Sequence, residues 1–282
     1  MYNPVSMARL AEMAIANEGP PVNSYHTNLG LTFNYHFHSS FSRPEKEDTE
    51  IEINKAIKKA HIFLKSADYL FITLGSAWVY TQIEPGEIVS NCHKMPAVNF
   101  TKRLLSAEEI VQTLTTMVEQ VAKYNSKVRT VFTISPVRHI KDTLEGNAIS
   151  KARLKTAIYD LCEKDERTDY FPAWEIMMDD LRDYRFYDND LLHPNSTAIE
   201  YLWEKFGERY MSEETREIMG QWQGVRKGLL HRPQNKYTGQ YLGFLRQMLK
   251  KLTTLSNKIN INDELRKLQR DIREVERSVR NF

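Results

Sequence analysis

The chain of 282 residues is 41% hydrophobic and 27% charged, and its 39 Lys and Arg nearly balance its 37 Asp and Glu. A chain this apolar is not disordered, and interspersed charges of both signs favour no general nucleic-acid partner. No apolar run reaches the length of about 18 residues that a membrane span needs. The composition predicts a globular protein that acts without a membrane or a nucleic acid, although its last quarter is basic.

The cysteines and the first residues bear on the compartment. Cys92 and Cys162 lie far apart, without the spacing of a metal site or a redox pair, so neither a disulfide nor a bound metal is expected. The sequence does not open with a charged segment followed by an apolar one, so no secretory signal is visible. These features predict a cytoplasmic protein without a cofactor.

The first third of the chain alternates between helical and extended patterns. The residues from Tyr2 to Ser6 read as a turn into an amphipathic helix over about 5–17. The aromatic segment 23–42 alternates like a strand or an extended loop, and 49–66 has apolar residues at helical spacing. The apolar segment 69–75 then predicts a buried strand that ends in a glycine turn.

The same helix and strand unit recurs. Ser106 and Glu109 form a capping box that opens a helix to about Asn125, and 129–136 predicts a second buried strand. The later elements expected are a helix over 150–163, a short strand over 169–172, a helix over 174–182 and a helix from Thr197–Glu200 to about 210. The alternation predicts a parallel sheet, covered on both faces, whose strand ends bring Gly75, Ser135 and the segment before Thr197 together.

The composition changes after Gly228, which predicts an α/β domain over 1–228 and a helical extension over 229–282. Two helices of the extension have apolar stripes with spacings of three and four. The stripes consist of Leu242, Leu245, Leu249 and Leu252, and of Leu265, Leu268, Ile272, Val275 and Val279. This pattern fits a helical hairpin packed on itself or on the domain, or helix-mediated self-association through 240–282.

The sharpest chemical feature is Asp190-Leu-Leu-His193, directly before a capped helix. A spacing of three residues lets the carboxylate orient the imidazole within one turn, so His193 can act as a general base toward a hydroxyl. Pro194 stiffens that turn. The pair alone is a weak signal, because a capping Asp beside a surface His produces it often.

Six short segments between about residues 2 and 210 form a specific set with this pair. They are YNPVS (2–6), ITLGSAWVY (72–80), NCHK (91–94), SPVRHIKD (135–142), DLRDYRFY (180–187) and DLLHP (190–194). As a set they resemble the bacterial GSCFA-domain proteins, which are similar to the SGNH hydrolase superfamily. The resemblance implies a flavodoxin-like, three-layer α/β/α fold, with Asp190 and His193 as the acid/base pair.

The resemblance also implies a serine nucleophile within a Gly-Ser-Cys-Phe-Ala motif, on a first strand before Tyr2. The motif is absent from the 282 residues, so we expect a truncated domain that is inactive as it stands. Gly75 resembles the glycine that helps to hold the oxyanion, but Ala77 stands where an asparagine is expected. Either Asn91 or His93 supplies that donor, with His93 also expected to bind substrate, or the NCHK segment is a polar turn.

Four more residues lie near the strand ends, and three of them have two readings each. Ser76 and Ser135 are read as turn formers, with a role as substitute nucleophile as the alternative. Arg138 binds a substrate carboxylate or sulfate through its fork, or forms a salt bridge with Asp142 or Glu175. His139 lies on the same rim and is expected to bind substrate.

Other histidines and methionines favour structural roles. His36 and His38 alternate along the aromatic segment and His26 lies nearby, but no carboxylate or cysteine stands at a metal-binding distance from them in the sequence. A packed or exposed aromatic strand is therefore the better reading. The run Ile176, Met177 and Met178 is expected in the core.

The resemblance implies a serine esterase or acyltransferase domain for a small-molecule or glycan ester, with O-acetyl groups of a glycan as the expected substrate. The alternative is a non-catalytic protein that binds a carbohydrate in the emptied pocket or a protein through the C-terminal helices. Upstream sequence that encodes Gly-Ser-Cys-Phe-Ala would favour the enzyme, and a stop codon there would favour the binding protein.

Overall fold

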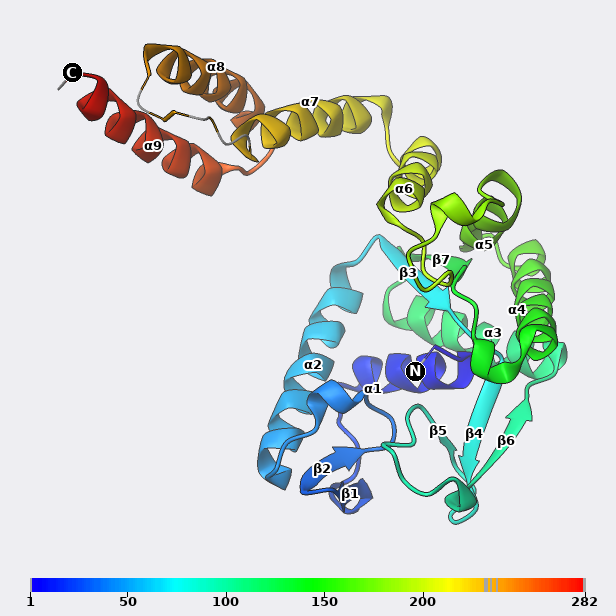
Figure 1. The fold of residues 1–282 in the computed structure, drawn as a ribbon. Helices are drawn as coiled ribbons and strands as arrows, with labels where there is room; N and C mark the ends of the chain where they lie inside the picture. The colour runs from blue at the N-terminus through cyan, green and yellow to red at the C-terminus, as the bar shows by residue number, and fades with distance from the viewer. Residues whose placement is uncertain (1, 231–232, 234, 237, 281–282) are drawn as a thin grey trace. The chain divides into compact units, whose positions relative to one another are not determined.

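The computed structural model describes residues 2–230, 233, 235–236 and 238–280 (Figure 1). The chain divides into two compact units, Met1–Leu202 and Trp203–Phe282. This division lies before the boundary expected after Gly228. The segment between the two positions is mainly helical and belongs to the second unit.

The first helix, α1 (Pro4–Ala16), begins as the YNPVS turn predicts. The Asn3 side chain accepts a hydrogen bond from the Ser6 amide at 2.9 Å, and Pro4 occupies the first turn, where a helix needs no amide donor. The helix ends at Asn17, which adopts a left-handed conformation with φ of 56°.

The aromatic segment 23–42 forms a hairpin rather than one strand. β1 (Tyr25–Asn28) and β2 (Leu31–Asn34) pair antiparallel. Leu29 and Gly30 both have positive φ, 50° and 74°, which a two-residue turn of this twist requires. β2 ends before His36, so the expected alternation of His36 and His38 on one strand face is wrong.

Three strands form the parallel sheet that the sequence predicts. β3 (Tyr69–Leu74), β7 (Arg129–Ile134) and β8 (Thr168–Phe171) run in the order β3-β7-β8, and both pairings are parallel. The expected α/β class is therefore confirmed. The carboxyl ends of β3 and β7 lie side by side, because Leu74 pairs with Ile134, and this places Gly75 next to Ser135.

Helices α1, α3 (Ala107–Tyr124) and α4 (Leu144–Lys164) pack on one face of this sheet (Figure 1). The apolar side chains of that face are fully or nearly fully buried: Ile72, Leu74, Phe132, Ile134, Leu114, Met117, Leu154 and Ile158. Each such side chain stabilises the fold by roughly 1.5–3 kcal/mol relative to exposure. Helix α2 (Lys46–Ser66) contacts α1 and the hairpin strand β2.

Two helix starts show how local chemistry sets the boundaries. The Ser106 and Glu109 capping box of α3 is present in both directions, as predicted. Helix α4 begins at Leu144, earlier than the expected start near Ser150, because the Thr143 hydroxyl caps the Gly146 amide. Thr143 has φ of 62°, a conformation that β-branched residues rarely adopt.

A second, antiparallel sheet lies in a region without predicted strands. It contains β4 (Trp78–Gln82), β5 (Ile88–Val89) and β6 (Phe100–Leu104) in the order β5-β4-β6. β4 begins three residues after Gly75, so this sheet continues the chain directly from the end of β3.

The segment after β8 is irregular. It contains α5 (Ala173–Glu175) and a π-helical turn (Ile176–Asp180), followed by α6 (Ser196–Tyr210). Met177 is buried, as expected for a core residue. The amide of Ala198 donates to the Asn195 side chain, so Asn195 rather than Thr197 caps α6. Short 3-10 turns occupy Val22–Ser24, Ser39–Phe41, Ala97–Asn99, Ile140–Asp142 and Tyr184–Phe186.

The second unit contains α7 (Glu213–Leu230), α8 (Gly239–Ser256) and α9 (Asn262–Arg280). The expected hairpin of α8 and α9 is confirmed, whereas α7 is an additional helix. The apolar stripes of the hairpin meet Val225 of α7 in one buried cluster. Among the helices described, none combines the length and the apolar character that a membrane crossing requires.

Candidate active site

The loop before α6 holds Asp190 and His193 in a compact turn. Its two arms meet where Tyr187 and Pro194 form an isolated antiparallel bridge, and the Asp188 amide donates to the His193 carbonyl at 2.8 Å. Leu191, at the tip, has φ of 59°, which non-glycine residues adopt only when the surrounding contacts hold them there. The local backbone therefore fixes the spacing of the pair.

Asp190 uses its two carboxylate oxygens differently. Oδ1 accepts the amides of Leu192 and His193 at 2.8 and 2.9 Å, and Oδ2 lies 2.5 Å from His193 Nδ1. The hydrogen bond from the His193 amide, with smaller contributions from the ring and from Leu192, lowers the pKa of Asp190 to about 2. Asp190 is therefore ionised at neutral pH.

The Asp190 contact determines which nitrogen of His193 can react. A carboxylate at Nδ1 favours the tautomer with a proton on Nδ1, because only that tautomer donates to it. Nε2 then has a free lone pair, and the His193 side chain is 59% exposed. The arrangement suits an imidazole that takes a proton from a hydroxyl and later returns it.

At the end of β3, the amides of Gly75 and Ser76 point at one oxygen. They donate to the Tyr2 carbonyl at 2.8 and 3.4 Å. A Cβ atom on Gly75 would lie 2.9 Å from the Tyr2 Cβ, so glycine is needed for this approach. Two amides on one oxygen resemble an oxyanion-binding arrangement, but the Tyr2 carbonyl occupies it here, and the role of Gly75 stays a prediction.

The two serines considered as substitute nucleophiles are engaged in turns. Ser76 Oγ accepts the Trp78 amide at 3.0 Å, and Ser135 Oγ accepts the Val137 amide at 3.3 Å. Within the described chain, neither hydroxyl has a histidine among its hydrogen-bond partners. Turn formation is therefore the role that the geometry supports.

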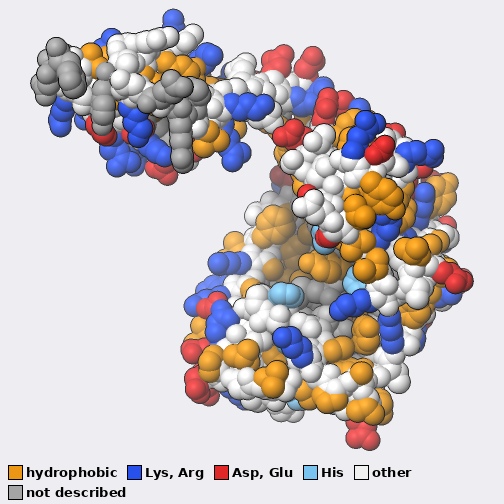
Figure 2. Space-filling model, in the orientation of Figure 1, with side chains coloured by type: hydrophobic (Ala, Val, Ile, Leu, Met, Phe, Trp, Pro, Cys, Tyr) orange, Lys and Arg blue, Asp and Glu red, His pale blue; other side chains and the backbone are white. Residues whose placement is uncertain are grey.

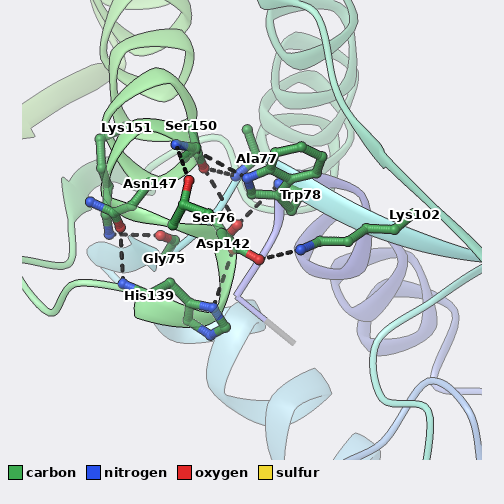
Figure 3. A network of polar contacts seen from close by, with 12 residues as sticks. Gly75, Ser76, Ala77, Trp78, Lys102, His139, Asp142, Asn147, Ser150 and Lys151 are labelled. Carbon is green, nitrogen blue, oxygen red and sulfur yellow. Dashed lines mark hydrogen bonds and ion pairs between the residues drawn. The ribbon is translucent and has the colours of Figure 1, made fainter. Parts of the chain in front are cut away.

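Helix α4 connects the ends of β3 and β7 through two residues that sequence reasoning missed (Figure 3). Lys151 Nζ donates to the carbonyls of Gly75 and Ser135 at 2.6 and 2.7 Å, and Ser150 Oγ accepts the Ala77 amide at 2.8 Å. Burial lowers the pKa of Lys151 to about 8. No sequence motif reveals this role, because it arises where three distant segments meet.

His139 belongs to a second histidine–carboxylate pair. Its Nδ1 lies 3.2 Å from Asp142 Oδ2, and its amide donates to the Asn147 side chain (Figure 3). Asp142 is buried and also binds Lys102 of β6, whose ammonium lies 4.6 Å from the centre of the Trp78 ring. The His139 ring itself is mostly exposed. Sequence reasoning did not foresee Asp142 as its partner.

Arg138 connects the segment after β7 with the loop that holds the Asp190 and His193 pair. Its guanidinium lies 5.1 Å from the centre of the Tyr187 ring and donates to the Tyr187 hydroxyl at 3.4 Å. The alternative expectation of a salt bridge with Asp142 or Glu175 is wrong, since both carboxylates bind lysines instead.

Asn91 and His93 form a turn beside the β1–β2 hairpin. Asn91 Oδ1 accepts the His93 amide at 3.0 Å, and the His93 ring stacks on Phe33 with centroids 4.2 Å apart. His93 Nε2 lies 3.0 Å from the carbonyls of Asn34 and Phe37. Burial lowers the pKa of His93, so the ring is neutral at pH 7. These contacts fit the polar-turn alternative, and the oxyanion and substrate roles of the two residues stay predictions.

The histidines of the aromatic segment have structural contacts. His36 contacts the Arg9 guanidinium and lies 3.7 Å from a Glu87 oxygen; burial, with a contribution from Arg9, lowers its pKa to about 4. His38 is exposed and caps Ser40, while His26 packs against Tyr35. In the part of the chain that the structure describes, no three His, Cys, Asp or Glu residues gather as a metal site would require.

The predicted residues therefore fall into three groups. Asp190 and His193 share one loop, which Arg138 touches through Tyr187. Gly75 and the segment after β7, which contains His139, both form hydrogen bonds with side chains of α4. Asn91 and His93 lie against the hairpin. Figure 2 shows a hollow in the surface of the first unit, with apolar side chains inside it and histidine side chains at its margin.

The comparisons with known proteins identify the family of the chain. The sequence model of the GSCFA family matches residues 1–206, and that of the GSCFA domain protein, C-terminal domain, matches residues 222–274. The chain belongs to the GSCFA family. No curated protein and no solved structure matches it.

Proposed function

We propose that this chain provides the acid/base half of a serine ester hydrolase or acyltransferase of the SGNH type. The observation that supports the proposal is the contact of 2.5 Å between Asp190 Oδ2 and His193 Nδ1. It holds an exposed imidazole with Nε2 available for proton transfer, on a loop whose backbone is fixed by its own hydrogen bonds.

The proposed chemistry is acyl transfer in two steps. A serine hydroxyl attacks the acyl carbon, its proton passes to His193 Nε2, and a tetrahedral oxyanion forms. The intermediate collapses, the bond to the alcohol oxygen breaks, and His193 returns the proton to that oxygen. Water, or a second alcohol in acyl transfer, then attacks the acyl-serine through the same proton movements and releases the serine.

Asp190 stabilises the imidazolium that forms during each step. Because its pKa is about 2, it stays ionised while His193 gains and loses its proton. The paired amides of Gly75 and Ser76 are our proposed oxyanion donors, once the Tyr2 carbonyl no longer occupies them. Lys151 donates a hydrogen bond to the Gly75 carbonyl and so fixes the orientation of the turn that follows β3.

The nucleophile is the serine of the Gly-Ser-Cys-Phe-Ala motif from which the family takes its name. That motif does not occur in the 282 residues. We therefore expect no esterase activity from these residues alone, and activity when the motif-bearing sequence is joined to them. The proposed substrate is an acyl ester, with O-acetyl groups of a glycan as the preferred class.

The test compares this chain with a chain extended upstream to include the motif, using p-nitrophenyl acetate. We expect hydrolysis by the extended chain only, and its loss on His193→Ala. The matched control is His38→Ala, an exposed histidine that caps the Ser39–Phe41 turn. Equal activity of the extended chain with and without His193 would refute the proposal.

One observation favours a second candidate, a non-catalytic carbohydrate-binding or scaffold protein. The hydroxyls of Ser76 and Ser135 serve their own turns and contact no histidine within the described residues. The two candidates differ in one outcome: a binding protein stays inactive toward esters in the extended form, while its fold and ligand binding remain intact.

A further inference from the structure

A small cavity lies between the segment after β7, the π-helical turn and the 3-10 turn Tyr184–Phe186. Its volume is about 130 Å³, which is the share of about four water molecules at ~30 Å³ each. The lining residues are Arg138, Met177, Met178, Arg182, Tyr184 and Tyr187. The lining therefore has two guanidinium groups and two phenol rings, and it has no carboxylate.

Arg138 lacks a carboxylate partner among the described residues. The two carboxylates that the sequence suggested as its partners bind lysines instead. Asp142 binds Lys102, and Glu175 binds Lys155 at 2.8 Å. A guanidinium is always charged at physiological pH, so a half-buried one without a counter-ion is available for an anionic ligand.

Arg182 also lacks a salt bridge within the described chain. Its neighbour Asp183 pairs with Arg185 at 3.9 Å and accepts the Arg185 amide, while Asp180 accepts the Tyr201 hydroxyl at 3.1 Å. Two uncompensated positive charges thus line one cavity, which is unfavourable unless an anion or solvent screens them.

The orientation of Arg138 is set before any ligand binds. Its guanidinium lies 5.1 Å from the Tyr187 ring centre and also contacts the Met178 sulfur at 3.7 Å. These contacts restrict the long side chain, and the N–H groups that do not face Tyr187 remain for a ligand. A preorganised fork loses less entropy when it binds a planar carboxylate.

We infer that this cavity binds the carboxylate of an acidic sugar, so that the ester substrate is a glycan with sugar-acid units. Arg138 and Arg182 recognise the carboxylate, and the rings of Tyr184 and Tyr187, with centroids 5.9 Å apart, pack against the apolar face of the sugar. The inference rests on the proposed function, because it names the substrate class for that site.

The cavity and the acid/base pair share one loop. Tyr187 forms the bridge with Pro194, and Pro194 directly follows His193. A sugar acid held by Tyr187 and Arg138 is therefore anchored at the base of the turn that presents His193. Binding energy gained at the carboxylate then positions the neighbouring ester group for attack.

The experiment is a titration of this chain, followed by the NMR signals of the arginine Nε–H groups at low chloride concentration. The ligands are D-glucuronate, D-glucose as the neutral control, and inorganic sulfate. We expect glucuronate to shift the Arg138 and Arg182 signals, and to bind about tenfold or more tightly than glucose.

Arg182→Gln removes one guanidinium without disturbing the core, because Arg182 is exposed. We expect glucuronate binding to weaken about tenfold or more in this variant. The matched control is Arg185→Gln, an exposed arginine of the same segment that does not line the cavity, and it should bind as the unmodified chain does. Thermal unfolding of each variant verifies that the fold is retained.

Three results would overturn the inference: equal binding of glucuronate and glucose, unchanged binding in Arg182→Gln, or sulfate binding more tightly than glucuronate. The binding test is independent of catalysis because it needs no nucleophile. If glucuronate binds through Arg182 but the extended chain hydrolyses no ester, the carboxylate site stands and the hydrolase proposal falls. If the extended chain hydrolyses p-nitrophenyl acetate and glucuronate does not bind, only the carboxylate site falls.

Discussion

Asp190 binds His193 twice, through its ring and through its amide. Oδ2 lies 2.5 Å from the ring Nδ1, and Oδ1 lies 2.9 Å from the His193 backbone nitrogen. One carboxylate thus fixes both the tautomer of the imidazole and the position of its backbone. Loss of the carboxylate should therefore impair proton transfer more than stability.

Asp190→Asn should lower the turnover number of the extended chain by about 10²–10⁴-fold, because an amide does not favour the Nδ1-protonated tautomer as a carboxylate does. The measurement is p-nitrophenyl acetate hydrolysis under saturating substrate. Asp188→Asn is the matched control, since this exposed residue of the same loop uses only its backbone in the turn. Equal losses in both variants would point to general disruption of the loop instead.

The pH dependence of hydrolysis should not report the Asp190 carboxyl. The pKa of Asp190 is lowered to about 2, so its stabilising contacts are fully present above its unfolded value of about 3.9 and are lost as pH falls through 2. Asp190 should therefore contribute no acidic limb to kcat/KM above about pH 4. An acidic limb near pH 4 would assign the limb to a carboxylate and contradict this account.

Lys151 should affect the pH dependence of stability. Burial lowers its folded pKa to about 8, below the unfolded value of about 10.4. The cost of burying its charge is fully present below pH 8 and disappears as pH rises toward 10.4. The deprotonation of Lys151 therefore adds about 3 kcal/mol to the free energy of unfolding across that window. Urea unfolding at pH 7.5 and 9.5 samples part of that window, where the expected difference is about 2 kcal/mol.

Lys151→Met should lack that increase, because the variant has no group to deprotonate. Lys164→Met is the matched control on the same helix, where the exposed lysine should leave the increase intact. The same pH dependence of unfolding in Lys151→Met and in the unmodified chain would show that other groups cause it.

Gly75→Ala should destabilise the first unit by about 1–3 kcal/mol, because the new Cβ would lie 2.9 Å from the Tyr2 Cβ. Gly146→Ala is the contrasting variant: its nearest neighbour would be 3.4 Å away, and alanine favours the α4 helix. Urea unfolding of both variants checks the difference. A Gly75→Ala variant as stable as Gly146→Ala would show that Tyr2 does not pack as described.

The fold could be predicted where short-range patterns determine it. The alternation of helices and apolar strands indicates the parallel sheet, and the capping box at Ser106 marks the start of α3. The antiparallel sheet could not be predicted in this way, since β4 and β6 are short, only partly buried and paired across a long connection. Their pairing is a tertiary property.

The site was predictable to the same limited extent. Asp190 and His193 are three residues apart, so one local turn brings them together. The contacts of Lys151 with Gly75 and Ser135 join three segments that are distant in sequence. His139 and Asp142 are also three residues apart, so a local turn makes that pair, but the contact of Asp142 with Lys102 of β6 joins segments that are distant in sequence. No spacing rule contains that information.

The most direct test of the account is the tautomer of the neutral His193 ring, measured on this chain by long-range ¹H–¹⁵N NMR. The account predicts a proton on Nδ1 and none on Nε2, with the Nδ1 proton shifted by its hydrogen bond to Asp190. A neutral ring protonated on Nε2 would contradict it, because that nitrogen could then accept no proton from a serine hydroxyl.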